Sequence, residues 1–177
     1  MSNYRRAFVQ NSYVFITFKT YNNSHILIDN IEILRNAFTK AMNKYNFEIF
    51  AISILPDHIH LILKPEKIEE YPKIIYSIKF NFSIKIVSPS INLTESKVKK
   101  GEKGIWQRRY WEHTILSEED LYKHLDYIFY NPVKHGYVNA VKDWEYSSFV
   151  KFVKLGWYDI NWGNNNDIMK IQNMNCE

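Results

Sequence analysis

Two segments rich in strand-forming residues are separated by only two residues near the middle of this 177-residue chain. Residues 47–55 read FEIFAISIL and residues 58–64 read HIHLILK. The Pro56-Asp57 dipeptide between them suits a tight turn. This pattern predicts a β-hairpin, and the rest of the fold has to be built around it.

Further strands and helices alternate on both sides of the hairpin. Residues 13–20 alternate like a strand, and residues 111–116 indicate another. Apolar residues between positions 31 and 45 recur every three or four residues, which predicts a helix capped by Asp29 or Asn30. This order favours an α+β fold, in which helices pack on an antiparallel sheet.

Two more helices are expected after the hairpin. One extends from about Pro72 to Ile86, followed by an exposed loop over residues 88–104. The other begins with the capped acidic segment 117–120 and is expected to end near Asn131, because proline disfavours helical geometry at the residue before it. Gly136 then permits a turn.

Composition excludes several classes of protein. The chain is 46% apolar and 24% charged, which allows a full core, and it has no apolar run long enough to cross a membrane and no signal peptide. Its one cysteine, Cys176, rules out an intrachain disulfide framework. We therefore expect an intracellular protein without a membrane partner, and an Asn-rich end from Asn161 that frays.

Positive charge is concentrated in one short stretch. Residues 97–109 carry a local net charge of +5 beside several aromatic residues, although the whole chain has a net charge of only +4. Such a block can neutralise phosphates and offer rings for bases to stack on, or it can be a solvated loop. The basic residues are Lys97, Lys99, Lys100, Lys103, Arg108 and Arg109.

A pair of histidines lies in the second strand of the hairpin. Residues two apart in a strand share a face, so His58 and His60 project together while Ile59, Leu61 and Leu63 point into a core. Two neighbouring imidazoles can share a metal ion. Two buried structural histidines would give the same pattern.

A polar edge is predicted on the late helix. Leu121, Leu125 and Ile128 define its buried stripe, and Tyr127 lies about 120° away from them. His124 and Asn131 fall on the same flank, three residues before and four residues after that tyrosine. Tyr127 is either an ordinary surface tyrosine or part of a site formed with the histidine pair.

The second possibility suits phosphate chemistry. A divalent ion held by two nitrogens and one oxygen keeps open positions for phosphate oxygens. A tyrosine can attack a phosphodiester and form a covalent intermediate that conserves the bond energy for a later joining step.

Three segments in this order, LPDHIHLIL, IWQRRYWEH and LDYIFYNPVKHGYV, resemble the signature blocks of the Y1, or IS200-like, transposases. The resemblance extends over residues 4–149 and is strongest to REP-associated tyrosine transposases, members of the HUH superfamily. It implies a ferredoxin-like HUH nuclease domain over residues 1–150, with a basic N-terminal arm, and a C-terminal tail over residues 151–177.

The resemblance also implies roles for single residues. Tyr127 corresponds to the nucleophile, and His58, His60 and Asn131 correspond to the ligands of Mg²⁺ or Mn²⁺, with His124 as the reserve third ligand. Single-stranded DNA beside a hairpin would be cleaved through a 5′-phosphotyrosine and then transferred to a new 3′ hydroxyl.

DNA contacts are expected from basic residues near the matched blocks. They are Arg5, Arg6, Arg108, Arg109 and Lys134. The same resemblance implies a bacterial, cytoplasmic and nucleoid-associated protein, and we expect a monomer rather than a homodimer.

Two other functions remain open at this stage. One is a domesticated binder of genomic DNA hairpins that no longer cleaves, and the other is an unrelated metallohydrolase with an incidental tyrosine. His113 and His135 are expected to be a hydrogen-bonded core histidine and a loop residue, and Trp144, Ser147 and Ser148 to serve packing and turn formation.

Overall fold

A four-stranded antiparallel sheet with the strand order β2-β3-β1-β4 forms the centre of the molecule. The computed structural model describes residues 8–87 and 103–163. With α1 and α2, the strands follow the β-α-β-β-α-β order of a ferredoxin-like fold, which confirms the predicted α+β class and the central hairpin. These elements are β1 (Tyr13–Lys19), α1 (Ile31–Met42), β2 (Phe47–Ile54), β3 (His58–Pro65), α2 (Tyr71–Ser83) and β4 (Trp111–Ile115).

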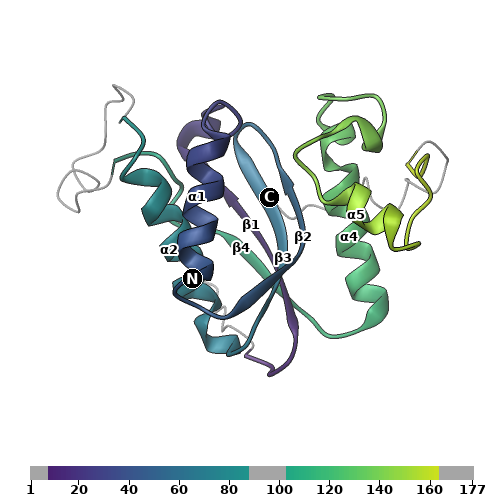
Figure 1. Cartoon of the computed structure of the whole chain (residues 1–177), viewed down its shortest axis with the longest axis horizontal. Helices are drawn as coiled ribbons and strands as arrows, with labels where there is room; N and C mark the ends of the chain where they lie inside the picture. Colours follow the sequence, from purple (N-terminus) through teal and green to yellow (C-terminus); the bar gives the residue numbers. More distant parts are fainter. Residues whose placement is uncertain (1–7, 88–102, 164–177) are drawn as a thin grey trace, which may run out of the picture.

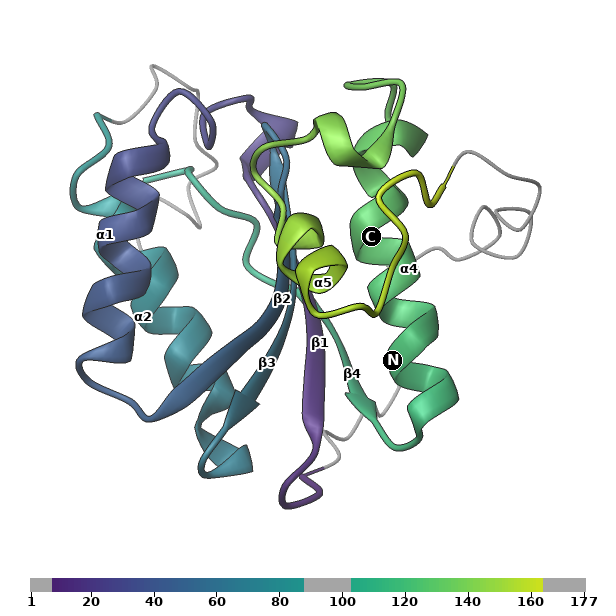
Figure 2. The ribbon, with the colours of Figure 1, turned by 45° about the vertical axis from the view of Figure 1, so that its right-hand side comes forward.

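Helices cover both faces of the sheet. Helices α1 and α2 lie on one face, whereas α4 (Glu118–Lys134) and α5 (Phe149–Lys154) lie on the other (Figures 1 and 2). Ile59, Leu61 and Leu63 of β3 enter the core under α1 and α2. The intervening residues of β3, including both histidines, therefore face α4, as the alternation of a strand requires.

Strand β2 contains a bulge. Ile49 pairs with Leu63 and Ala51 pairs with Ile62, so Phe50 is an extra residue without a position in the ladder. Its ring packs against Tyr13 and against Phe152 and Trp157, which belong to the C-terminal layer formed by α5 (Phe149–Lys154) and the residues after it. The bulge thus places one aromatic ring of β2 against three others.

The ends of α1 and α2 differ slightly from the sequence prediction. Asn30 occupies the N-cap position of α1, but its side chain donates to the Ile26 carbonyl instead of capping the helix. Helix α2 ends at Ser83, three residues earlier than expected. Most of the predicted loop lies outside the described residues, as does the end of the chain beyond residue 163.

Helix α4 begins as predicted and ends later than predicted. The Ser117 side chain accepts a hydrogen bond from the Asp120 amide, which is the expected N-cap. The prediction that Pro132 ends the helix was wrong, because the helix continues through this buried proline to Lys134. Proline removes one hydrogen bond only one turn before the helix would end in any case.

A left-handed glycine closes α4. Gly136 has a φ of 72°, and its amide donates to the Val133 carbonyl while the Tyr137 amide donates to the Pro132 carbonyl. This pair of bonds is a Schellman motif. It fixes the direction in which the chain leaves the helix.

The segment after α4 packs beside this helix and against β2, on the same face of the sheet. Phe149, Phe152 and Tyr158 are buried around Phe129. The residue-150 boundary given in the sequence prediction lies within α5 (Phe149–Lys154), and Phe152 and Tyr158 beyond it are buried. Trp144 and Ser148 attach this segment to β2 by hydrogen bonds to Ile54 and Ile52, in the packing role expected for them.

Replacing Gly136 by alanine tests the closure of α4. A Cβ at this position meets no atom within 4 Å, so the cost comes only from the left-handed backbone. We expect Gly136→Ala to lower the free energy of unfolding by about 1 kcal/mol in urea denaturation. Gly136→Asn should lose less, and equal losses for the two variants would contradict this explanation.

Candidate active site

The two histidines of β3 form the base of a buried polar cluster. His58 and His60 project toward α4, and their ring centroids are 4.7 Å apart at 82°. Both side chains are buried. A buried imidazole needs a partner for each ring nitrogen, so the neighbours of these atoms decide what the pair can do.

Asp57 orients the first imidazole. Its Oδ1 lies 2.6 Å from His58 Nδ1. Burial raises the pKa of Asp57, but the hydrogen bond to His58 and favourable electrostatics with this ring outweigh it and hold that pKa below its usual value. Because the carboxylate is ionised, Nδ1 carries a proton and donates it, and in the neutral ring Nε2 presents its lone pair toward α4.

Thr17 holds the second imidazole from the neighbouring strand. Thr17 is directly opposite His60 in the β1–β3 ladder, and its Oγ1 lies 2.7 Å from His60 Nδ1. This contact fixes the orientation of the ring. Sequence reasoning missed both Thr17 and Asp57; a carboxylate next to the first histidine was the available signal for Asp57, but nothing local pointed to Thr17.

Helix α4 supplies the other side of the cluster. Tyr127, Asn131 and Lys134 are spaced by four and three residues and therefore share one face of the helix. Asn131 Oδ1 lies 3.3 Å from His58 Nε2, and the Tyr127 ring is 5.1 Å from the His60 ring. Lys134 Nζ lies 5.1 Å from the centroid of the Tyr127 ring. The structure thus brings together the predicted nucleophile and the predicted ligands.

Tyr127 is not on the surface. Its exposed fraction is 0%, and Asn131 and His124 are also buried, although the helical wheel placed this edge outside the apolar stripe. The reason is that α4 is covered on two sides. Tyr127 packs against Phe15 and His60 of the sheet, and Phe129 packs against Phe152 of α5 and against Tyr158. A helix covered on two sides buries a wider arc than one stripe.

The donor set fits a divalent metal ion. His58 Nε2 with a lone pair faces Asn131 Oδ1, and two acceptors at 3.3 Å gain nothing from each other unless a proton or a cation lies between them. Neighbouring ligands of an octahedral ion are about 3 Å apart. The Nδ2 atom of Asn131 is also buried and has no hydrogen-bond partner among the described residues.

A third histidine borders the same cluster. The ring of His135, the C-cap residue of α4, is 5.2 Å from the ring of His58 at 67°. The sequence prediction assigned it to a loop with no further role. The only sequence feature that could have placed His135 near the cluster was its position directly after the helix that carries Tyr127 and Asn131.

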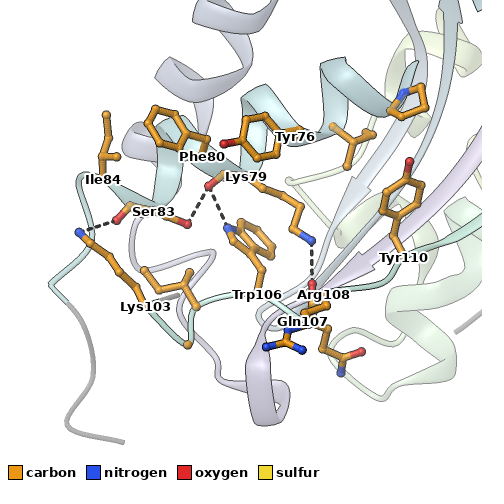
Figure 3. Close-up of a pocket in the computed structure, with 14 residues that line it drawn as sticks. Tyr76, Lys79, Phe80, Ser83, Ile84, Lys103, Trp106, Gln107, Arg108 and Tyr110 are labelled. Atoms are coloured by element: carbon orange, nitrogen blue, oxygen red, sulfur yellow. Dashed lines mark hydrogen bonds between the residues drawn. The ribbon is translucent and has the colours of Figure 1, made fainter. Parts of the chain in front are cut away.

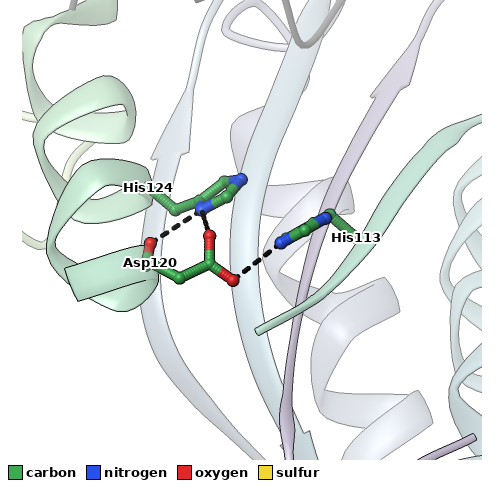
Figure 4. Close-up of side chains that lie close together, drawn as sticks. All are labelled: His113, Asp120 and His124. Atoms are coloured by element: carbon green, nitrogen blue, oxygen red, sulfur yellow. Dashed lines mark hydrogen bonds and ion pairs between the residues drawn. The ribbon is translucent and has the colours of Figure 1, made fainter. Parts of the chain in front are cut away.

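A separate group of titratable residues joins β4 to the first turn of α4 (Figure 4). His113 Nε2 lies 2.7 Å from one carboxylate oxygen of Asp120, and His124 Nδ1 lies 3.1 Å from the other. His124 Nδ1 also lies 2.8 Å from the Asp120 carbonyl, and the two imidazole rings stack 4.7 Å apart. His124, the reserve metal ligand, is thus grouped with Asp120 and His113.

Burial and hydrogen bonding shift the pKa values within this group. Burial raises the pKa of Asp120, but the hydrogen bond from His113 and the amide of Leu116 hold it below its usual value. Burial lowers the pKa of His124. In the folded protein His124 therefore favours the neutral form more strongly than a solvated histidine does.

Three of the five basic residues predicted to bind DNA lie within the described part of the chain. Arg108 and Arg109 are exposed and follow Trp106, which lies beside the end of β1. Lys134 is exposed at the end of α4. Arg5 and Arg6 lie outside the described residues.

Comparison with known proteins decides the family. The family model for IS200-like transposases matches residues 7–131, which include the histidine pair, Tyr127 and Asn131. The chain therefore belongs to the IS200-like transposases, in the group of REP-associated tyrosine transposases. The comparisons thus confirm the resemblance found in the sequence.

The similar proteins match this transposase over almost their whole length. A Haemophilus influenzae protein, provisionally named a REP-associated tyrosine transposase, is 45% identical over 170 residues, covering 95% of this chain and 97% of its own. The REP-associated tyrosine transposase of Escherichia coli K12 is 37% identical over 164 residues, covering 92% and 91%.

A solved structure supports the fold. A REP-associated tyrosine transposase bound to a REP hairpin aligns with a TM-score of 0.76 and 34% identity, covering 93% of each chain. Within residues 8–87 and 103–163, none of the helices is a candidate membrane span.

Acidification should destabilise the protein through His124. A histidine whose folded pKa is lowered stabilises the fold above its unfolded pKa of about 6.5, and this contribution is lost as the pH falls below that value. We expect the free energy of unfolding, measured in EDTA, to fall between pH 7.5 and 5.5. The fall should be smaller in His124→Gln.

His25→Gln is the matched control, because His25 is exposed and lies outside this group. Its pH dependence should equal that of the natural protein. If His124→Gln shows the same pH dependence as His25→Gln, the assignment to His124 is wrong.

Proposed function

We propose that this transposase cleaves and rejoins single-stranded DNA beside hairpins of the REP type, with Tyr127 as the nucleophile and with a divalent metal ion, Mg²⁺ or Mn²⁺, held by His58, His60 and Asn131. The observation that carries the proposal is that one short face of α4 places Tyr127 and Asn131 against both histidines. A related structure is bound to a REP hairpin, which supports the choice of DNA.

The reaction conserves one phosphodiester bond. The phenolic oxygen of Tyr127 attacks the phosphorus, the bond to the 3′ oxygen breaks, and that oxygen takes up a proton while the phenolic proton is lost. The 5′ phosphate is then linked to tyrosine. Attack by a new 3′ hydroxyl reverses the same step, so no external energy source is required.

Each residue of the cluster has a distinct task in this proposal. A bound divalent ion would supply positive charge against the oxygens of the scissile phosphate. Asp57 and Thr17 orient the two imidazoles that hold it, and Asn131 completes the set from α4. Lys134, above the Tyr127 ring, adds positive charge where the phosphate must lie.

Burial of Tyr127 has a consequence for the order of events. The side chain is inaccessible in this conformation. DNA binding must therefore expose the Tyr127 hydroxyl before the phosphate can reach it.

A single chain supplies every residue of the proposed site. Only two residues separate β4 from α4, so α4 can reach the sheet of its own chain and the proposed site needs no second copy. On this ground we propose a monomer as the active unit. We infer that it acts on DNA in the bacterial cytoplasm, where its hairpin substrate would lie.

Removing the Tyr127 hydroxyl should abolish the chemistry and leave DNA binding intact. We expect Tyr127→Phe to lower formation of the covalent protein–DNA adduct by about 10³-fold or more, because no other group replaces the nucleophile. The measurement is a denaturing gel with a labelled single strand that carries the hairpins flanking the gene, in Mn²⁺ or in EDTA.

Tyr130→Phe, on the same helix, serves as the control and should keep normal adduct formation. Adduct formation by Tyr127→Phe at the normal rate would remove Tyr127 from the mechanism. Tight hairpin binding by the natural protein without any adduct would favour a non-cleaving hairpin binder.

Loss of the Thr17 hydroxyl should weaken metal binding. Thr17→Val keeps the shape of the side chain but removes the hydrogen-bond partner of His60 Nδ1. We expect the Kd for Mn²⁺, measured by titration calorimetry, to rise about 10- to 100-fold. Thr39→Val makes the same change on the exposed side of α1 and should leave the Kd unchanged; an equal Kd in Thr17→Val would contradict the proposed role.

A further inference from the structure

A groove and a group of titratable side chains both lie outside the chemistry proposed above. The groove, of about 500 Å³, is formed by α2 and the segment from Lys103 to Tyr110 (Figure 3). The described residues that line it include no histidine, cysteine, aspartate or glutamate, so a metal ion finds no ligand of these kinds there. The group of His113, Asp120 and His124 consists entirely of such side chains (Figure 4).

The three side chains of this group converge. One nitrogen or carboxylate oxygen from each lies within 4.8 Å of those from the other two. His113 Nε2 is 2.7 Å from one oxygen of the Asp120 carboxylate, and His124 Nδ1 is 3.1 Å from the other. Two ligand atoms of a tetrahedral zinc ion lie roughly 3.3 Å apart. Small movements of the side chains would therefore let the group enclose an ion.

The backbone holds these residues in place. His113 lies in β4, which pairs with β1, and Asp120 and His124 are one turn apart on α4. The first turn of α4 is capped by Ser117, and the Leu116 amide donates to the Asp120 carboxylate at 3.3 Å. Binding an ion would thus require no ordering of a loop, which lowers the entropic cost of binding.

The protonation states of the group suit a cation. Burial lowers the pKa of His124, so this ring favours its neutral form. Burial raises the pKa of Asp120, but the hydrogen bond from His113 holds it below its usual value, so the carboxylate is ionised. Metal ions need neutral imidazoles and ionised carboxylates. An ion would replace the protons that join the rings to the carboxylate, and these would move to the other ring nitrogens or to solvent.

The group is open on one side. The side chains of His113 and Asp120 have exposed fractions of 39% and 24%, whereas that of His124 has only 5%. An ion can therefore enter from solvent past His113. The same opening leaves room for water as a further ligand.

The donor atoms favour zinc over the ions proposed for cleavage. Zn²⁺ is commonly bound by three protein ligands drawn from imidazoles and carboxylates, with water in the fourth position. Mg²⁺ prefers oxygen ligands, and Mn²⁺ is the weakest binder of the first-row divalent metals at sites of this kind.

We propose that His113, Asp120 and His124 form a zinc site that joins β4 to the first turn of α4. The ion binds the two imidazoles and the carboxylate and clamps the strand to the helix. This site shares no residue with the proposed cleavage site, so it does not depend on the proposed function.

Titration calorimetry with Zn²⁺ at pH 7.5, without DNA, measures this binding apart from any reaction. We expect His113→Gln and Asp120→Asn each to raise the Kd about 100-fold or more, because loss of a residue that merely orients a ligand already costs about 10- to 100-fold. Zn²⁺ should also raise the Tm of the natural protein by more than that of either variant.

Two further variants locate the binding. His25→Gln removes an exposed histidine outside the group and should bind Zn²⁺ normally. His60→Gln removes a ligand of the proposed cleavage site, which could itself take zinc, and should keep the binding that His113→Gln loses. Circular dichroism in EDTA establishes that each variant is folded before the titration.

An unchanged Kd for Zn²⁺ in both His113→Gln and Asp120→Asn would overturn the proposal. So would loss of all zinc binding in His60→Gln together with normal binding in His113→Gln, because zinc would then occupy the proposed cleavage site alone. Adduct formation tests the proposed function separately, so either proposal can fail alone.

Discussion

Burying two imidazoles between a sheet and a helix is the constraint on which the rest of this structure depends. Neither ring can remain without hydrogen-bond partners at such depth. The fold supplies partners from the hairpin turn and from β1: Asp57 bonds His58 and Thr17 bonds His60, while Asn131 of α4 faces the second nitrogen of His58. The strand register and the rotation of α4 are therefore both tied to the chemistry of the histidine pair.

Much of the fold could be predicted from local pattern. The hairpin, the alternation of β3 and the cap at Ser117 depend on neighbouring residues, and the sequence displays them directly. The burial of Tyr127 could not be predicted from a helical wheel, because α4 is covered on two sides, by the sheet at Tyr127 and by the segment after the helix at Phe129. Thr17 is 43 residues from His60, so only the strand register reveals their contact.

Charge is distributed unevenly along α4. Glu118, Glu119 and Asp120 occupy its first turn, where the helix dipole favours negative groups, and Lys134 lies in its last turn. Lys134, which complements the negative C-terminal end of the dipole, therefore also supplies positive charge at the proposed phosphate site. Asp120 has the additional task of holding His113 and His124, which joins the acidic end to β4.

The bulge at Phe50 allows β2 both to pair regularly with β3 and to contact the C-terminal layer. Residues on either side of it keep regular alternation, and Phe50 itself reaches Phe152 and Trp157 of the C-terminal layer. Phe50 therefore holds that layer while Ser53 and Ile54 remain in register with His60 and Ile59. The mechanical attachment of the C-terminal layer and the alignment of the histidines are thus carried by different residues of one strand.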